Sequence, residues 1–266
     1  MLSDKIEQIK EAIAKKESAL VAFSGGVDSA VLAALAYKVL ERRALAMTAE
    51  FISLSGHELK DAIRTAKEIG IPHRIVPFNV MAEPGFAENT PQRCYYCKKG
   101  LIRTLAEFAD EEVLNVILDG TNASEIQGHR PGWQAIREAG NRVYTPFVEF
   151  GITKEEVREI AHALGLSVAD RPSMTCLSTR FPYGQPITED GIERIEKAEE
   201  YFTSLGFYQF RVRDHGNIAR IEVMLSEFDR ILQEHERIVT FLKKLGFNYV
   251  TLDMEGFRSG SMDEVL

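Results

Sequence analysis

The sequence predicts an α/β protein with a large domain built on a parallel sheet and a smaller α+β domain after it. Short apolar runs alternate with helical patterns through the first 170 residues, as strands do when helices cover both faces of a parallel sheet. Residues 171–186 then hold three prolines and no clear period, which is typical of a functional loop or a linker. We therefore expect domains at 1–170 and 187–266, joined by 171–186. A length of 266 residues fits this division.

The elements of the first domain follow from hydrophobic spacing and from the residues that begin and end helices. Ile6, Ile9 and Ile13 recur at helical intervals, so the first 16 residues form an amphipathic helix. Thr153 is a candidate N-cap, and Gly70 ends another helical pattern. The predicted strands are 19–23, 44–51, 73–78 and 113–118, and the further predicted helices are 30–40, 58–69, 101–109 and 154–164.

The second domain contains an internal repeat. Residues 201–207 and 240–247 each read as a helix end, a glycine and the start of a strand, which implies pseudo-symmetry within the domain. The predicted helices are 192–205 and 228–245, and the predicted strands are 208–213, 218–223 and 248–253. Because the helices and strands are few and mixed, we expect a small α+β unit.

The composition excludes several classes of protein. With 45% hydrophobic and 27% charged residues, the chain is neither collagen-like nor disordered. The 32 Lys and Arg against 40 Asp and Glu give a net charge of -8, which argues against nonspecific binding of nucleic acid. No apolar run approaches the roughly 20 residues of a membrane span, and the N-terminus lacks a signal-peptide pattern. We expect a cytoplasmic protein without a membrane partner.

Residues 24–29, Ser-Gly-Gly-Val-Asp-Ser, lie between a predicted strand and a predicted helix. Gly25 and Gly26 allow positive φ and a close approach of backbone N–H groups to a ligand, and the helix N-terminus favours an anion, so the loop predicts a phosphate site. The loop lacks the lysine of the usual P-loop and the third glycine of a dinucleotide fingerprint. Asp28 would repel phosphate unless a divalent cation bridges them. The alternative is a glycine-rich turn in which Ser29 only caps the helix.

This loop resembles the S-G-G-x-D-S motif of the PP-loop ATP pyrophosphatase superfamily, which cleaves ATP between the α and β phosphates and passes AMP to a substrate. The resemblance implies a Rossmann-like domain of the adenine nucleotide alpha hydrolase-like kind. It also implies that ATP and Mg²⁺ are held by Ser24, Gly25, Gly26, Asp28 and Ser29.

Residues 118–125 resemble a second segment of the superfamily, G-T-N-x-x-E, in which the Thr and Glu side chains meet phosphate, Mg²⁺ or substrate. The resemblance implies that Thr121 contributes to ATP binding and Glu125 to Mg²⁺ binding. Taken alone, the segment is equally consistent with a turn in which Asn122 or Ser124 caps a helix.

Three cysteines are too few, and odd in number, for a disulfide framework. Cys94 and Cys97 have the two-residue gap that lets two thiolates meet at one metal or cluster, or form a redox pair. Cys176 lies in an irregular segment between Arg171 and Arg180, whose positive charges favour a reactive thiolate. The alternative for each is a buried apolar cysteine.

The whole chain resembles the family of ATP-dependent sulfur transferases that build the nickel-pincer nucleotide of lactate racemase. In that family the carboxylates of a pyridinium biscarboxylate mononucleotide are adenylated and converted to thiocarboxylates, and sacrificial members donate the sulfur of the cysteine that matches Cys176. Besides the phosphate loop, the resemblance rests on residues 89–91, 95–96, 98–99, 130–132, 176, 178–184, 211–213, 218–222 and 257–260.

The chain departs from the sacrificial pattern, which has other residues at the positions of Cys94 and Cys97. Members with three such cysteines ligate a [4Fe-4S] cluster whose fourth iron carries an exogenous sulfide. The resemblance thus implies that Cys94, Cys97 and Cys176 hold a cluster, with sulfide as a partner and a homo-oligomeric assembly. The alternatives are Zn²⁺ at the same ligands, or a Cys94–Cys97 redox pair beside a sacrificial Cys176.

Arg211 and Arg213 lie two apart on a predicted strand, so both point to one face and could clamp a substrate phosphate. With Arg180, they are the predicted substrate-binding residues. A solvated strand face with surface ion pairs is the alternative. The function that competes within the superfamily is tRNA thiolation, which the negative net charge and the lack of a zinc-ribbon-like domain disfavour. A nucleotide sensor without turnover is the candidate from a different class.

Overall fold

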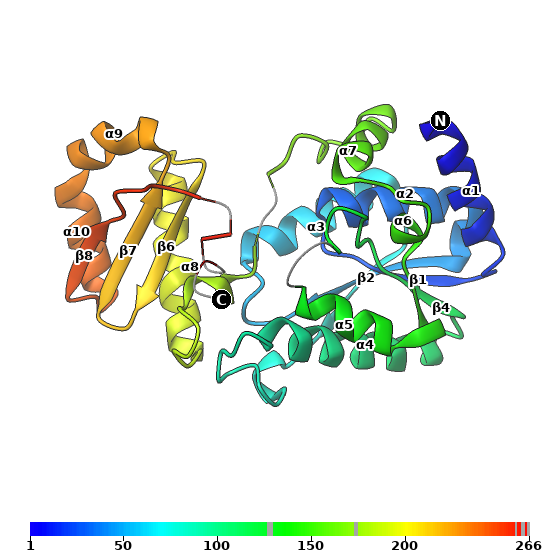
Figure 1. Cartoon of the computed structure of the whole chain (residues 1–266), viewed down its shortest axis with the longest axis horizontal. Helices are drawn as coiled ribbons and strands as arrows, with labels where there is room; N and C mark the ends of the chain where they lie inside the picture. Colours follow the sequence, from blue (N-terminus) through cyan, green and yellow to red (C-terminus); the bar gives the residue numbers. More distant parts are fainter. Residues whose placement is uncertain (127–129, 173–174, 259, 262–263, 265–266) are drawn as a thin grey trace. The chain divides into compact units, whose positions relative to one another are not determined.

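A computed structural model describes residues 1–126, 130–172, 175–258, 260–261 and 264 (Figure 1). Ser173, Met174 and Ser259, which belong to the predicted linker or to a motif segment, lie outside these residues. The chain divides into two compact units. The first comprises Met1–Pro84 and Cys94–Met174, and the second comprises Gly85–Arg93 and Thr175–Leu266.

The passage from the first unit to the second falls within the predicted linker 171–186, but the grouping of Gly85–Arg93 with the second unit has no signal in the sequence pattern. Backbone hydrogen bonds hold this segment there. Ile187 N–H donates to Ala87 O at 2.8 Å, and Gly184 N–H donates to Asn89 O at 3.0 Å. Such pairing joins residues about 100 positions apart, and a pattern of neighbouring residues does not predict contacts over that separation.

The described residues of the first unit form a five-stranded, fully parallel sheet, which confirms the predicted α/β fold. Its order is β3 (His73–Pro77), β2 (Ala44–Glu50), β1 (Ala19–Ala22), β4 (Val116–Leu118), β5 (Val143–Tyr144). The strand order reverses between β1 and β4. In open parallel sheets a crevice for ligands forms at the carboxyl ends of the strands at such a switch point.

Helices cover both faces of this sheet (Figure 1). One face carries α1 (Leu2–Ala14), α2 (Val27–Leu40), α3 (Gly56–Ile69), α6 (Pro146–Glu149) and α7 (Lys154–Ala163). The other face carries α4 (Arg93–Glu111) and α5 (Pro131–Glu138). Short 3₁₀ turns are η1 (Glu41–Arg43), η2 (Val80–Ala82) and η3 (Gly140–Arg142).

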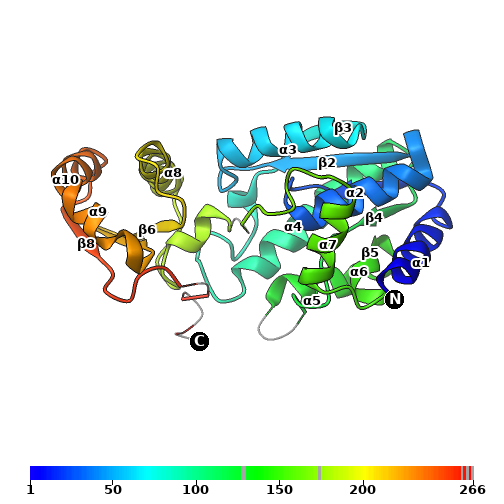
Figure 2. The ribbon, with the colours of Figure 1, turned by 90° about the horizontal axis from the view of Figure 1, so that it is seen from above.

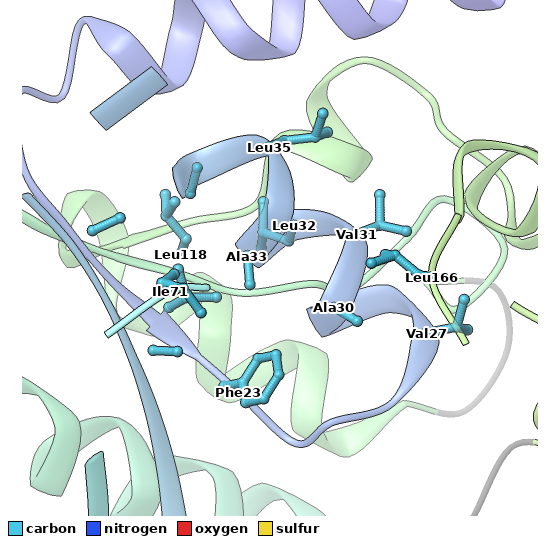
Figure 3. Packing of buried hydrophobic residues seen from close by; sticks show 14 of the residues in the cluster. Phe23, Val27, Ala30, Val31, Leu32, Ala33, Leu35, Ile71, Leu118 and Leu166 are labelled. Carbon is cyan, nitrogen blue, oxygen red and sulfur yellow. The ribbon is translucent and has the colours of Figure 1, made fainter. Parts of the chain in front are cut away.

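Helix α2 is the centre of the first unit's core. Its side chains pack with Phe23, Ile71, Leu118 and Leu166 (Figure 3), and the helix contacts α1, α3 and α7. A helix enclosed in this way has apolar residues on nearly every side, as its Ala-, Val- and Leu-rich sequence shows. The packing fixes the N-terminus of α2, where the phosphate loop ends.

The helix caps follow local chemistry. Thr153 caps α7 as predicted, with its Oγ1 accepting from Glu156 N–H, and Ser55 and Glu58 form the same reciprocal capping box at α3. Gly70 ends α3 in the left-handed region at φ 81°.

Two expectations for the first unit were wrong. The strand predicted at 113–118 begins only at Val116, because Val113 lies in the turn after α4 at φ 55° and is 81% exposed. The helix predicted at 101–109 is much longer, since α4 begins at Arg93 and includes two cysteines. Helices α5 and α6 and strand β5 are short and had no clear periodic signal.

The second unit has a mixed sheet in which β7 (Ile218–Val223) pairs antiparallel with β6 (Phe210–His215) and parallel with β8 (Tyr249–Leu252). Helices α8 (Glu189–Ser204) and α10 (His235–Lys244) cover one face (Figure 2), with α9 (Phe228–Gln233) before α10. Two 3₁₀ turns are η4 (Leu177–Arg180) and η5 (Leu225–Glu227). This confirms the smaller α+β part of the fold.

The internal repeat takes the same local form twice. Gly206 and Gly246 follow α8 and α10 with φ of 83° and 98°, and Tyr201 stacks on Phe241 at 4.0 Å between ring centroids. The single helix predicted at 228–245 is instead two helices that meet at Glu234. Apolar spacing continues across that break, so the periodicity hides it.

The strand predicted at 208–213 is shifted, because Tyr208 is 74% exposed and β6 extends to His215. In the part of the chain that the structure describes, none of the helices has the length and apolar character that a membrane crossing requires.

Candidate active site: a phosphate loop and an arginine-rich cysteine segment

The phosphate loop has the strand, turn and helix context that the sequence predicts. Gly25 has φ 74°, and a Cβ there would lie 2.5 Å from Ala62 Cα, so only glycine fits. Ser29 Oγ donates to Gly26 O at 3.1 Å and accepts from Ser24 N–H at 3.2 Å, while Ser24 Oγ accepts from Gly26 N–H at 3.3 Å. The two serines therefore shape the loop itself.

A cavity of about 190 Å³ adjoins this loop, lined in part by residues 24–28, Glu125 and Lys154. Ligand pockets for whole drug-sized molecules are typically about 300–1,000 Å³, so this space suits part of a nucleotide, such as its phosphates. Asp28 accepts a hydrogen bond from Asn122 Nδ2 at 2.8 Å and pairs with Lys154 Nζ. Burial, and then repulsion by Asp28, raise the pKa of Glu125. Two carboxylates that repel one another across a cavity suit a divalent cation.

Thr121 has a different place. Asp119 Oδ1 accepts from Thr121 N–H at 2.9 Å and from Thr121 Oγ1 at 2.6 Å, and its Oδ2 accepts from Lys98 Nζ at 2.7 Å. Burial raises the pKa of Asp119, but the Lys98 ammonium and the two hydrogen bonds from Thr121 together outweigh burial, so the net shift of the pKa is downward. Thr121 therefore braces the loop after β4. A Cβ at Gly120 would lie 3.1 Å from Ser29 N, so the two loops are in close contact.

The sequence pattern did not indicate a role in this site for three residues: Lys98, Lys154, and Asn122 as a hydrogen-bond donor to Asp28. Lys154 carried a usable signal. It is the first residue of α7, where a positive charge opposes the helix dipole, so its presence there calls for another partner. That partner, Asp28, lies 126 positions earlier in the sequence.

Cys94 and Cys97 lie in the first two turns of α4, three residues apart and thus on one side of the helix. Cys94 is exposed and Cys97 is half-buried, and neither these two nor Cys176 forms a disulfide. Among the described residues no group of three or more His, Cys, Asp and Glu side chains is arranged to hold a metal ion. Cys94 and Cys97 belong to the first unit, and Cys176 belongs to the second.

Cys176 is the N-cap residue of the 3₁₀ turn η4, and its Sγ donates to Ser178 Oγ at 3.2 Å. Arg180 anchors this turn. Its Nη1 donates to Thr175 O at 3.1 Å, and its Nε and Nη2 pair with the two oxygens of Glu199 at 2.7 and 2.8 Å. The predicted neighbour Arg171 instead belongs to the first unit, where it pairs with Asp61.

Asn89 and Arg93 brace the same segment. The Asn89 Nδ2 atom lies within 2.8 to 3.2 Å of the carbonyl oxygens of Phe181, Pro182 and Gln185, and Arg93 Nη1 donates to Ser178 O at 3.0 Å. Asn89 is fully buried, and the three carbonyls share the two N–H groups of its amide.

Arg211 and Arg213 share a face of β6, as their alternation predicts, but their surroundings differ. Arg213 is 4% exposed and forms a double hydrogen bond with Glu222, at 2.8 and 2.9 Å. Arg211 donates to Phe210 O at 2.7 Å and lies over the Phe257 ring. Burial, and then the neighbouring Arg180, lower the pKa of Arg211 to about 10. Within the described residues no carboxylate forms an ion pair with Arg211, so its charge is available to an anion.

The chain is similar to known proteins over its first half and over its full length. The family model described as NAD synthase matches residues 1–128, which include the phosphate loop. An uncharacterized protein of Synechocystis sp. is 43% identical over 100% of this chain and 99% of its own length. Pyridinium-3,5-bisthiocarboxylic acid mononucleotide synthase of Lactiplantibacillus plantarum is 35% identical over 100% of this chain and 96% of its own length.

The tRNA-specific 2-thiouridylase MnmA of Rickettsia africae is a more distant relative, 25% identical over 59% of this chain and 53% of its own length. The matches to the Synechocystis and L. plantarum proteins cover the whole chain and therefore both of its units. On this basis the chain belongs to the PP-loop family of ATP-dependent sulfur transferases that includes the synthase of L. plantarum.

Proposed function

We propose that the chain converts a pyridinium-3,5-biscarboxylic acid mononucleotide to its bisthiocarboxylic acid, for the nickel-pincer cofactor of lactate racemase. The L. plantarum relative, similar over the whole chain, is named for that product. The observation in this chain that best supports the proposal concerns Arg211. Its guanidinium is half-buried, lies near Arg180, which anchors the turn after Cys176, and forms no ion pair with any of the described carboxylates. Such a cation suits the phosphate or a carboxylate of a small nucleotide.

The first step is adenylation. A substrate carboxylate oxygen attacks the α-phosphorus of ATP, the bond to the β-phosphate oxygen breaks, and pyrophosphate leaves. Backbone N–H groups of Gly25 and Gly26 at the start of α2 would bind phosphate oxygens. Asp28 and Glu125 would hold Mg²⁺, whose charge removes their mutual repulsion and offsets that of the departing pyrophosphate.

The second step is sulfur transfer. A sulfur nucleophile attacks the acyl carbon of the adenylate, the bond from that carbon to the AMP oxygen breaks, and AMP carries away the electron pair. Cys176 is the proposed sulfur donor or the ligand that positions the sulfur. Arg180 and Ser178 hold it in place, and Arg211 and Arg213 lie on the adjoining strand of the same unit.

The donor set of the chain fits an iron-sulfur cluster, because none of the three cysteines forms a disulfide and two of them are three residues apart on one helix. We propose Cys94, Cys97 and Cys176 as its ligands. When bound, the cluster would leave one iron without a protein thiolate and so supply a site for exogenous sulfide. The donor set also suits Zn²⁺, and the experiment below separates the two.

The test measures products and metal together. With the biscarboxylate substrate, ATP should give AMP and pyrophosphate; ADP and orthophosphate as main products would contradict the proposal. Cys176→Ser should still release pyrophosphate but form no thiocarboxylate. Anaerobically reconstituted protein should bind about four irons per chain, and Cys94→Ser or Cys97→Ser should remove them.

Other outcomes assign other routes. One bound zinc excludes the cluster, and a loss of the mass of one H₂S from Cys176 after a single turnover identifies a sacrificial sulfur. A salt-dependent shift of tRNA on a gel, with thiolation of the tRNA, would favour the activity for which the MnmA relative is named.

A further inference from the structure

Arg171 is the second cation of the phosphate cavity. It lines the same space as residues 24–28 and Lys154. Its Nη1 lies 3.1 Å from Asp61 Oδ2, and 19% of its side chain is exposed. Across the described residues this is the only ion pair that the guanidinium makes, so most of its five N–H donors remain available to a ligand.

Asp61 does not depend on Arg171 for its charge balance. Its Oδ1 lies 2.6 Å from Arg64 Nη2, and its Oδ2 lies 3.2 Å from His57 Nδ1. A folded protein is strongly destabilised when a buried carboxylate loses its sole cationic partner. Because Asp61 is 7% exposed but keeps Arg64 in any case, Arg171 can turn to a ligand without leaving a bare buried charge.

The backbone of Arg171 is anchored on both sides of the side chain. Its N–H donates to Val168 O at 3.1 Å, and its carbonyl accepts from Arg158 Nη2 at 3.0 Å. The residue therefore combines a fixed backbone with a guanidinium that Asp61 directs. An arginine fork of this kind matches phosphate oxygens in pairs, which a single ammonium does not.

The charges of the cavity require such a residue. Four carboxylates line it, those of Asp28, Glu58, Asp61 and Glu125, against the two cations Lys154 and Arg171. Lys154 forms an ion pair with Asp28, and its ammonium would become available to a phosphate only when a metal ion took its place beside Asp28. Pyrophosphate carries most of the negative charge of ATP, so its binding next to these carboxylates needs a cation besides Mg²⁺.

We propose that Arg171 binds the β- and γ-phosphates of ATP and stabilises the pyrophosphate leaving group, with Asp61 positioning it beforehand. This assignment rests on the proposed use of ATP, but not on the identity of the carboxylate substrate. It adds to the nucleotide site a phosphate-binding residue that lies outside the two segments that resemble the superfamily, residues 24–29 and 118–125.

The test is calorimetric binding of inorganic pyrophosphate with Mg²⁺, and separately of AMP, to the full chain. Arg171→Ala should weaken pyrophosphate binding by about 10- to 100-fold, the range for a lost charged hydrogen bond, and leave AMP binding unchanged. Arg171→Lys keeps the positive charge, so it should lose less affinity, and it serves as the test if Arg171→Ala does not fold. Arg64→Ala is the matched control, because Arg64 also pairs with Asp61 but does not line the cavity.

Equal affinities for pyrophosphate in wild type, Arg171→Ala and Arg171→Lys would overturn this inference, as would an equal loss of AMP binding. A wild-type protein that binds neither ATP nor pyrophosphate would overturn both the proposed function and the inference. Pyrophosphate binding that depends on Arg171, in a protein that forms no thiocarboxylate, would overturn only the proposed substrate.

Discussion

Replacing Arg213 should lower stability as well as substrate binding, and the structure allows the size of the loss to be worked out. Arg213→Met removes both hydrogen bonds to Glu222, at 2.8 and 2.9 Å, a third to Thr179 O at 2.7 Å and a fourth to Ser261 Oγ at 2.9 Å. Glu222 is 1% exposed, so water does not replace the lost partner.

The expected loss lies at the low end of the range for a broken buried ion pair. Such losses are about 3–5 kcal/mol, and Glu222 keeps Arg220 Nη2 at 2.9 Å from its Oε1. We therefore expect about 3 kcal/mol. For a protein of this size, that free energy corresponds to a fall in Tm of about 6 to 12 °C.

Thermal unfolding followed by circular dichroism is the assay, with Arg211→Ala as the matched control on the same strand. Arg211 leaves no carboxylate unpaired, so its loss should change Tm by less than about 4 °C while it raises the KM for substrate. The double variant Arg213→Met/Glu222→Met should recover most of the stability, because apolar residues of similar volume often replace a buried pair without cost.

If Arg213→Met lowered Tm by less than about 2 °C, or if the double variant were no more stable than the single one, the ion pair would not stabilise the fold as argued. In that case the side chain would be engaged chiefly with substrate.

Further predictions concern the nucleotide site and the cysteine segment. Gly25→Ala should abolish release of pyrophosphate in a folded protein, because its Cβ would meet Ala62; full activity would contradict the loop geometry. Glu125→Gln should raise Tm at pH 8 in the absence of Mg²⁺, but not at pH 4. The pKa of Glu125 is higher in the folded protein than in the unfolded chain, so folding favours the protonated carboxyl. The wild type therefore loses stability as the pH rises through the folded-state pKa, and the neutral glutamine avoids this loss. An equal gain at both pH values would refute this. Asn89→Ala should lower Tm and thiocarboxylate yield, since the buried carbonyl of Phe181 and the half-buried carbonyls of Pro182 and Gln185 lose a donor; unchanged melting would exclude that role.

The sequence by itself determined the parallel α/β domain, the phosphate loop and the small α+β unit. These features depend on contacts close in sequence. An apolar run, two glycines and a helix with apolar residues on every side specify strand, turn and buried helix together, and Thr153 caps its helix through Glu156, three residues away.

Tertiary structure alone decided the partners of the charged side chains. Lys154 reaches Asp28 across 126 positions, Arg171 pairs with Asp61, and the Gly85–Arg93 segment supports the Cys176 turn from another part of the chain. Hydrophobic periodicity encodes which face of an element is buried, but it does not encode which charge lies opposite another. That depends on how parallel strands, joined by long crossovers, bring their carboxyl ends to one edge of a sheet.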